Sequence, residues 1–315
     1  MNKDSMDVSK LRTEQRNPNS FEIDTKTTSE ILRIINREDA TVPKAVTPAI
    51  PVISELVDEI VKAFKAGGRL FYIGAGTSGR LGVLDASECP PTFGVPPTMV
   101  QGIIAGGRKA LTTAVEWVED NKQAGVEALR EVEFSNRDVL IGITASGQAP
   151  FVRAAMGYAA SLGAVVGALA CNKDSAIFDH AAYKIFIDVG PEILTGSTRM
   201  KAGTAQKLVL NMITTTAMIK LGKVYNNFMV DLTPTNAKLK RRALWLVQEI
   251  SGCDREEAER SLKAADNHVK TAILMVILGC DAKKAGELLE RHDGNLHFAI
   301  TSGCGERGDA DDKEV

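Results

Sequence analysis

Short apolar runs alternate with longer stretches of helical periodicity through the middle of this chain, and that alternation limits the possible folds more than any other feature. The runs are rich in valine and isoleucine, as buried parallel strands are. They fall at residues 70–73, 100–104, 139–143, 165–169 and 184–187. Helical stretches lie between them, for example at 109–120 and 150–162. This order predicts an α/β fold in which helices cover both faces of a parallel sheet. Ligands of such sheets bind beyond the carboxyl ends of the strands.

Two of the predicted strands end in loops that combine glycine with hydroxyl side chains. One loop covers 74–80 and the other covers 142–148. Glycine turns that lead into a helix bring backbone N–H groups up to a phosphate. The hydroxyl pair Thr77-Ser78 sits where a pyrophosphate would need close backbone approach, and no Walker-type Gly-Lys-Ser/Thr follows, so a single phosphate monoester is the favoured ligand. The candidate phosphate-binding residues are Gly76, Thr77, Ser78, Thr144, Ser146 and Gly147.

A third polar loop, at 191–204, precedes another helical stretch. It places hydroxyl groups and two cations, Arg199 and Lys201, around Gly196 and Gly203. With the free backbone N–H groups of a helix N-terminus, these side chains predict an anion-binding surface. The candidate ligands in this loop are Ser197, Thr198 and Lys201. For any single residue here, ordinary helix capping is the alternative.

Composition narrows the class of protein. The chain has 315 residues, a formal net charge of −2 and 44% hydrophobic residues, which suits one large α/β domain with a small satellite. The balanced charge provides no field for nucleic acid or an anionic membrane, so neither is an expected partner. Five scattered cysteines without a C-x-x-C spacing indicate free thiols in a reducing cytoplasm. The four histidines lack metal-ligand spacing, and we expect no signal segment and no membrane span.

The regions on either side of the predicted sheet have a different character. Residues 1–50 are expected to form a loose polar arm, up to about residue 24, followed by a helix at 28–38. The main domain is expected at 51–245 and a small helical domain at 246–300. The helical domain is inferred from three short amphipathic stretches at 254–264, 269–279 and 281–291. The acidic tail at 301–315 is expected to be disordered.

Acidic side chains stand near the predicted ligand loops. Glu88 lies just before a Pro-Pro pair, where a rigid turn would hold it in place, and a solvated glutamate at a helix end is the alternative. Glu116 and Glu119 are three residues apart, which puts them on one face of the predicted 109–120 helix. Two carboxylates that flank a bound sugar phosphate suit removal of a proton beside a carbonyl and protonation of a leaving oxygen.

Four segments together are similar to a known family. They are Tyr-Ile-Gly-Ala-Gly-Thr-Ser-Gly-Arg-Leu-Gly at 72–82, Asp-Ala-Ser-Glu-Cys-Pro-Pro at 85–91, Ile-Ala-Gly-Gly at 104–107 and Thr-Gly-Ser-Thr-Arg-Met-Lys-Ala-Gly-Thr at 195–204. In these segments the chain resembles the N-acetylmuramic acid 6-phosphate etherases, which are lyases built on a sugar-isomerase (SIS) domain. The resemblance extends over almost the whole chain, from about residue 24 to residue 297.

The resemblance implies a three-layer parallel sheet of the SIS, flavodoxin-like type with a small C-terminal three-helix appendix, similar to a ubiquitin-associated domain. It implies a carbon–oxygen lyase that releases D-lactate from N-acetylmuramic acid 6-phosphate in cell-wall amino-sugar recycling, with no metal or other cofactor. By motif, the two glutamates of the family fall on Glu88, the proton donor to the departing lactate oxygen, and on Glu119, which would handle the C2 proton. Ser87 joins the substrate-binding residues, and a homodimer is the expected assembly.

One residue departs from the family pattern. SIS proteins usually carry a hydroxyl residue two positions after the glycine of the second loop, but here Gly147 and Gln148 are followed by Ala149. A hydrogen bond to a charged group is worth about 1.5–3 kcal/mol. The phosphate affinity is therefore expected to be lower, unless Gln148 or water substitutes.

Two other functions stay open. A non-catalytic SIS-type sensor of sugar phosphates would need neither Glu88 nor Glu119. An aldose–ketose isomerase would need a base beside C2 but no acid for a lactyl ether. The Ser-Glu-Cys-Pro-Pro block at 87–91 favours the etherase.

Overall fold

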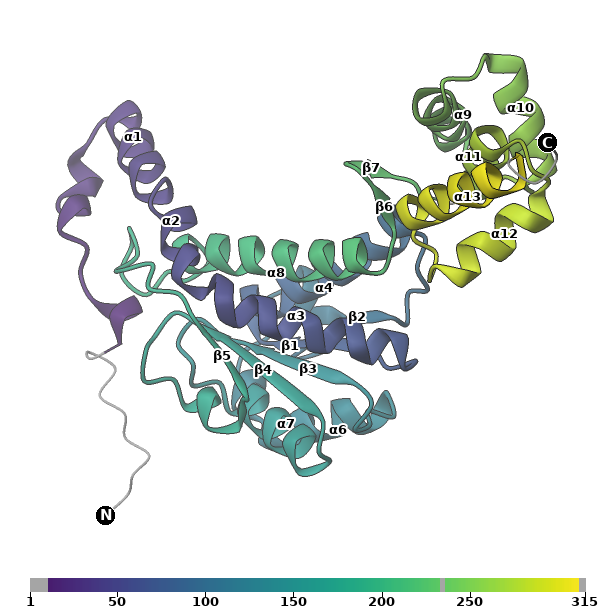
Figure 1. Cartoon of the computed structure of the whole chain (residues 1–315). Coiled ribbons are helices and arrows are strands. Elements are labelled where there is room, and N and C mark those ends of the chain that lie inside the picture. The colour runs from purple at the N-terminus through teal and green to yellow at the C-terminus, as the bar shows by residue number, and fades with distance from the viewer. Residues whose placement is uncertain (1–10, 233–235, 312–315) are drawn as a thin grey trace. The chain divides into compact units, whose positions relative to one another are not determined.

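The computed structural model describes residues 11–232 and 236–311, with the side chains of 306–311 excepted. Its centre is a parallel sheet of five strands in the order β2-β1-β3-β4-β5 (Figure 1). The strands are β1 (Leu70–Gly74), β2 (Val100–Ile104), β3 (Val139–Ile143), β4 (Val165–Ala170) and β5 (Tyr183–Phe186). Each lies within one residue of its predicted run, so the predicted α/β parallel sheet is confirmed. The order 2-1-3-4-5 is the flavodoxin-like one.

Helices cover the two faces of this sheet, as predicted (Figure 1). On one face lie α3 (Ile50–Lys65), α4 (Gly76–Phe93) and α8 (Lys201–Lys220). On the other lie α6 (Lys122–Glu131) and α7 (Pro150–Ser161). The layers explain why β1, β3 and β4 are apolar along their length, since both of their faces are covered. The edge strands β2 and β5 are less buried and include Gln101 and Lys184.

Strand β1 shows how the two faces are filled. All five of its residues are buried, and successive side chains point to opposite faces. Tyr72 packs against Gly82 of α4, where a Cβ atom would lie only 2.8 Å from the tyrosine Cβ. Phe71 and Ile73 belong to a buried cluster that includes Met156 of α7.

The N-terminal region is better ordered than predicted. Three turns of 3₁₀ helix, η2 (Arg12–Glu14), η3 (Pro18–Ser20) and η4 (Ile23–Thr25), precede α1 (Thr28–Asp39) and α2 (Val42–Val46). The expected loose arm is therefore wrong for residues 11–24. Some of its polar side chains make specific hydrogen bonds, as Asn17 does to Glu38 and Ser20 to the Ile193 carbonyl oxygen. Residues 1–10 lie outside the described part of the chain.

The predicted helix at 109–120 is broken. Only α5 (Lys109–Thr112) and the 3₁₀ turn η6 (Val118–Asp120) form, and Trp117 between them has a φ of 65°. β-branched and aromatic residues fill the gap, and they lose rotamer freedom in a helix. Glu116 and Glu119 consequently do not share a helix face.

The chain divides into two compact units. The sheet unit comprises the described residues up to Ser87 together with Pro97–Thr214, and the helical unit comprises Glu88–Pro96 and the described residues from Thr215 onward. The helical unit contains the short hairpin β6 (Val224–Tyr225) and β7 (Phe228–Met229) and five helices. These are α9 (Ala237–Ser251), α10 (Arg255–Ala264), α11 (Val269–Leu278), α12 (Ala282–Arg291) and α13 (Leu296–Asp311).

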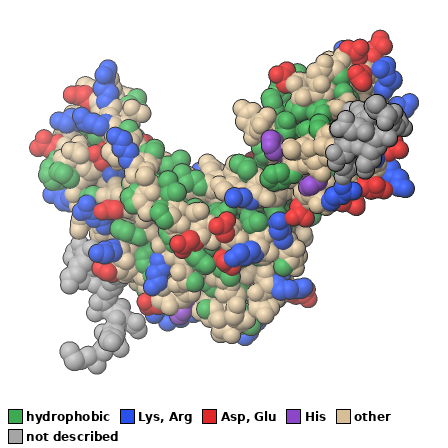
Figure 2. Space-filling model, in the orientation of Figure 1, with side chains coloured by type: hydrophobic (Ala, Val, Ile, Leu, Met, Phe, Trp, Pro, Cys, Tyr) green, Lys and Arg blue, Asp and Glu red, His purple; other side chains and the backbone are tan. Residues whose placement is uncertain are grey.

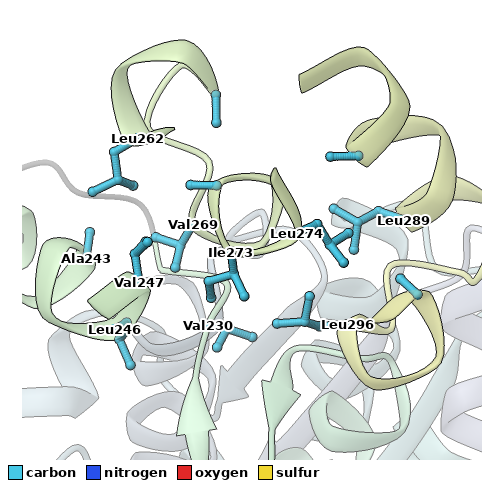
Figure 3. Packing of buried hydrophobic residues seen from close by; sticks show 14 of the residues in the cluster. Val230, Ala243, Leu246, Val247, Leu262, Val269, Ile273, Leu274, Leu289 and Leu296 are labelled. Atoms are coloured by element: carbon cyan, nitrogen blue, oxygen red, sulfur yellow. The ribbon is translucent and has the colours of Figure 1, made fainter. Parts of the chain in front are cut away.

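The helical unit is larger than the predicted appendix at 246–300. Figure 3 shows its apolar core, in which Val230 and Ala243 pack with Ile273 and Leu296. The three predicted helices are present, but α9, α13 and the hairpin share their core. Part of the expected disordered tail at 301–315 is helical, because α13 continues to Asp311. Within this part of α13, Gly303 packs closely on Leu278.

The surface agrees with the balanced composition. Acidic and basic side chains are interspersed over the face seen in Figure 2. In the described part of the chain, no helix combines the length and the apolar character that a membrane crossing requires.

Candidate active site

The first predicted ligand loop is the tight turn from β1 into α4. Gly74 and Gly79 approach so closely that a Cβ on Gly79 would lie 2.7 Å from the Gly74 carbonyl oxygen. The turn therefore needs glycine, and it starts α4 directly at the carboxyl end of the strand. Thr77 is half-buried and Ser78 is buried. The Ser78 hydroxyl donates to Oε1 of Gln206 in α8, at 3.0 Å.

The second loop follows β3, which pairs with β1 so that Gly74 lies opposite Ile143. The two loops are thus neighbours at one edge of the sheet, as the sequence predicted. Thr144 is buried, and its Oγ1 lies 3.4 Å from Oγ of Ser146. Gly147 has a φ of +77° and no room for a side chain, since a Cβ would collide with Ser175.

The unusual Ala149 stands at the N-cap of α7. It provides no side-chain hydrogen bond to the helix, and Pro150 occupies the first helical position. A serine or threonine at an N-cap accepts a hydrogen bond from the first turn. The first N–H groups of α7 therefore face the second loop without the cap that a hydroxyl residue would supply.

The third loop differs from its prediction. The N-terminus of α8 is already occupied, because the Glu192 carboxylate accepts from the backbone N–H groups of Lys201 and Ala202, both at 2.9 Å. The Lys201 ammonium group lies 2.8 Å from Oε2 of Glu38, and both side chains are buried. The free helix N-terminus and the free lysine expected here are therefore wrong. Lys201 supports the loop from within.

Two carboxylates in this buried network respond differently to their surroundings. Burial alone would raise the pKa of Glu38, but hydrogen bonds from Lys201, Asn17 and Asn19 outweigh it and hold the pKa below its ordinary value. Burial raises the pKa of Glu192, and its two backbone donors offset only part of that effect.

The N-terminal segment holds the third loop in place. The Asn17 amide nitrogen donates to Glu38 at 2.8 Å and to the Pro191 carbonyl at 3.2 Å. The backbone N–H of Gly196 donates to the Thr13 carbonyl oxygen at 3.1 Å. Ser197 and Thr198 remain half-buried on this braced loop.

A buried carboxylate joins the helices that carry the loops. Asp85 of α4 accepts from Lys207 at 2.9 Å, from Thr214 at 3.0 Å and from the Tyr72 hydroxyl at 3.3 Å. These contacts tie β1, α4 and α8 together. The motif at 85–91 contains Asp85, but its partners Lys207 and Thr214 are more than 100 residues further along the chain and were not predictable from the sequence.

The predicted acidic residues are exposed. Ser87 and Glu88 lie on α4 just before Pro90 and Pro91, and the Ser87 hydroxyl donates to the Leu84 carbonyl oxygen at 2.8 Å. The prolines lack N–H groups, so α4 loses two of its own hydrogen bonds directly after Glu88. Glu119 is exposed in the segment that leaves the carboxyl end of β2. That end lies beside the first loop, because Ile104 pairs with Gly74.

Comparison with known proteins shows the class of domain to which the sheet belongs. Residues 52–160 match the family described as the glucokinase regulatory protein N-terminal SIS domain, so the sheet and its loops form an SIS-type domain. A phosphoheptose isomerase structure from Francisella tularensis has 17% identity and a TM-score of 0.49, and covers 62% of this chain and 100% of that chain.

Full-length relatives identify the family. The N-acetylmuramic acid 6-phosphate etherase of Klebsiella aerogenes is 54% identical over 95% of this chain and 99% of its own length. That of Actinobacillus pleuropneumoniae serotype 5b (strain L20) is 53% identical over 94% of this chain and 97% of its own. The chain belongs to the N-acetylmuramic acid 6-phosphate etherase family.

Proposed function

We propose that this protein is a carbon–oxygen lyase that converts N-acetylmuramic acid 6-phosphate and water into N-acetylglucosamine 6-phosphate and D-lactate, as a step in amino-sugar recycling. The observation that carries the proposal is the similarity to etherases along nearly the whole chain. The geometry supports it, since the family segments at 72–82 and 104–107 lie at the carboxyl ends of the neighbouring strands β1 and β2, beside the loop that follows β3.

The phosphate would bind where β1 and β3 end. We assign it to the turn at Gly76, Thr77 and Ser78 and to the loop at Thr144, Ser146 and Gly147, with Ser87, Ser197 and Thr198 completing the substrate site. The N-termini of α4 and α7 point N–H groups and a positive dipole end at these loops. Lys201 would position the third loop through Glu38 and would not itself contact the phosphate.

The two exposed glutamates would perform the proton transfers. Opening of the sugar ring gives an aldehyde, which acidifies the C2–H bond. Glu119 accepts the C2 proton while the C3–O bond breaks, and Glu88 donates a proton to the departing lactate oxygen. Water then adds its oxygen to C3 of the unsaturated aldehyde, and a proton returns to C2.

The assembly and location belong to the same proposal. A homodimer would cover Glu88 and Glu119, both of which one chain leaves exposed, and symmetric dimers are the commonest oligomers. A cytoplasmic location fits the five free cysteines. Light scattering at micromolar concentration tests the dimer, and a fully active monomer would contradict it.

The decisive test follows the reaction by NMR in D₂O. The wild type should release D-lactate and incorporate deuterium at C2 of N-acetylglucosamine 6-phosphate. Glu88→Ala should lose lactate release by about 10²–10⁴-fold but retain C2 exchange on the product, whereas Glu119→Ala should lose both. Glu116→Ala, an exposed glutamate three residues from Glu119, is the matched control and should keep both.

Two outcomes would favour other functions. If the wild type binds the phosphosugar but neither releases lactate nor exchanges C2, the non-catalytic sensor is correct, an alternative that the match to a regulatory SIS domain keeps open. If it exchanges C2 without cleaving the ether, the aldose–ketose isomerase gains support. Normal exchange in Glu119→Ala and none in Glu88→Ala would mean that the two roles are reversed.

A further inference from the structure

Two glutamines near the predicted phosphate loops hold unsatisfied hydrogen-bond donors. Among the described residues, four buried side-chain nitrogen atoms have no hydrogen-bond partner. Two belong to the helical unit, and the other two are Nε2 of Gln148 and Nε2 of Gln206. Buried polar atoms are nearly always paired in proteins, so unpaired donors need an explanation.

Gln206 is the more deeply buried of the two, with 1% of its surface exposed. It lies in the second turn of α8, and its Oε1 accepts the hydroxyl proton of Ser78 at 3.0 Å. The nitrogen and oxygen of one amide share a carbon, so Nε2 also lies beside the first loop. Because the Ser78 hydroxyl gives its one proton to Gln206, Ser78 would offer the phosphate its backbone N–H, and the unpaired N–H of Gln206 is a side-chain donor beside it.

Gln148 belongs to the second loop itself. It follows Gly147, and its backbone N–H donates to Oγ of Ser146 at 3.3 Å. It also precedes Ala149, the residue that leaves the N-terminus of α7 without a side-chain cap. An amide donor therefore stands next to the position where a hydroxyl donor is missing.

We propose that the side-chain amides of Gln206 and Gln148 donate hydrogen bonds to the phosphate group of the bound phosphosugar. This inference rests on the substrate class of the proposed function and adds two ligands to it. Neighbouring lysines have other partners, since Lys201 is paired with Glu38 and Lys207 with Asp85. Neutral amide donors, hydroxyl groups and helix N-termini would then hold the dianion together.

The test measures binding without turnover. Dissociation constants for inorganic phosphate and for N-acetylglucosamine 6-phosphate are determined by calorimetry, and Tm is measured without ligand. Gln206→Met should raise both constants tenfold or more, equivalent to about 1.4 kcal/mol per tenfold. Its ligand-free Tm should change little, because removal of the unpaired donor offsets the loss of the acceptor for the Ser78 hydroxyl. Gln148→Met should change both constants in the same direction.

The matched control is Gln101→Met. Gln101 lies on β2 near its amino end, and its amide nitrogen already donates to the Thr98 carbonyl oxygen at 3.0 Å. Its replacement should leave both dissociation constants unchanged. A drop in Tm for Gln206→Met with unchanged phosphate binding would show a purely structural role and overturn the proposal.

Gln206→Glu keeps the proposal testable if the methionine variant does not fold. Its carboxylate retains an acceptor for Ser78 but repels the phosphate, so binding should weaken further than in Gln206→Met and recover partly as the pH falls. Wild-type affinity in Gln206→Glu would contradict the inference. A wild type that binds phosphosugar through these glutamines yet releases no lactate would instead refute only the etherase reaction.

Discussion

Helices α7 and α8 of the sheet unit begin differently from α9, α10 and α12 of the helical unit, although α1 and α6 of the sheet unit also have local caps, at Thr27 and Asn121. In the helical unit, α9, α10 and α12 each start with Asn236, Asp254 or Asp281, whose side chain accepts the N–H three residues later at 2.8–2.9 Å. In the sheet unit, α7 starts at Ala149 without such a cap, and α8 is capped by Glu192, nine residues before Lys201. The absence of a side-chain cap leaves the first N–H groups of α7 available for the phosphate that we propose.

The two units place their buried charges differently. In the helical unit, Lys270 donates to Asp231 and to two carbonyl oxygens within a largely aliphatic interior. In the sheet unit, a chain of polar contacts lies beneath the third loop, from Asn17 through Glu38 to Lys201. Each unit therefore buries an ion pair, and the pair of the sheet unit supports a candidate ligand loop.

The largest effect is expected when this buried network is cut. Lys201→Met leaves Glu38 buried without its cation, and breaking a buried pair from one side costs about 3–5 kcal/mol. Chemical denaturation should show this loss of unfolding free energy in the sheet unit. Adding Glu38→Gln to Lys201→Met should recover part of it. A loss below about 1 kcal/mol would mean that Lys201 is free to bind phosphate after all.

The pH dependence should separate the two carboxylates of the network. The pKa of Glu38 is lowered on folding, so its stabilisation is present above the ordinary glutamate pKa and is lost as the pH falls through the lower folded pKa. The stability difference between the wild type and Glu38→Gln should therefore shrink below about pH 4.5. Glu192 should have the opposite effect on stability, because its pKa is raised on folding. Its contribution to the free energy of unfolding is present at low pH and is lost as the pH rises through the folded pKa.

Hydrogen exchange followed by mass spectrometry should show which part of the chain loses stability when Glu38 is protonated. Peptides from 191–204 should lose protection in acid before peptides from α11 and α12 do. Earlier loss in the helical unit would contradict the contrast between the two cores.

The sequence predicted local features well and distant contacts poorly. All five strands and the helical stretches at 254–291 were predictable, because burial on both faces or on one stripe imposes a short-range pattern. The break in the predicted 109–120 helix at Trp117 was indicated in the sequence only by the poor helix formers around it. The roles of Glu38 and Gln206 depend on contacts with Lys201 and Ser78, which are more than 100 residues away along the chain, and no spacing pattern in the sequence predicts such contacts.

Removing a local cap tests the comparison in the helical unit. Asp281→Ala deletes the acceptor for the Lys284 N–H and should lower the stability of the helical unit by about 1 kcal/mol. Its phosphate affinity should equal that of the wild type. A measurable change in phosphate binding would mean that the two units do not divide stability and ligand binding as inferred.

The smallest effect is expected from adding a cap where the sheet unit lacks one. Ala149→Thr places a hydroxyl at the N-cap of α7, where its oxygen can accept from the first turn while its proton remains available to a phosphate. Stability should rise by up to about 1 kcal/mol, and KM for N-acetylmuramic acid 6-phosphate should fall. Ala149→Val, which is similar in shape and lacks the hydroxyl, is the matched control.

If Ala149→Thr gains stability but binds phosphate more weakly, the added cap competes with the ligand for the same N–H groups. If neither quantity changes relative to Ala149→Val, the N-terminus of α7 takes no part in phosphate binding.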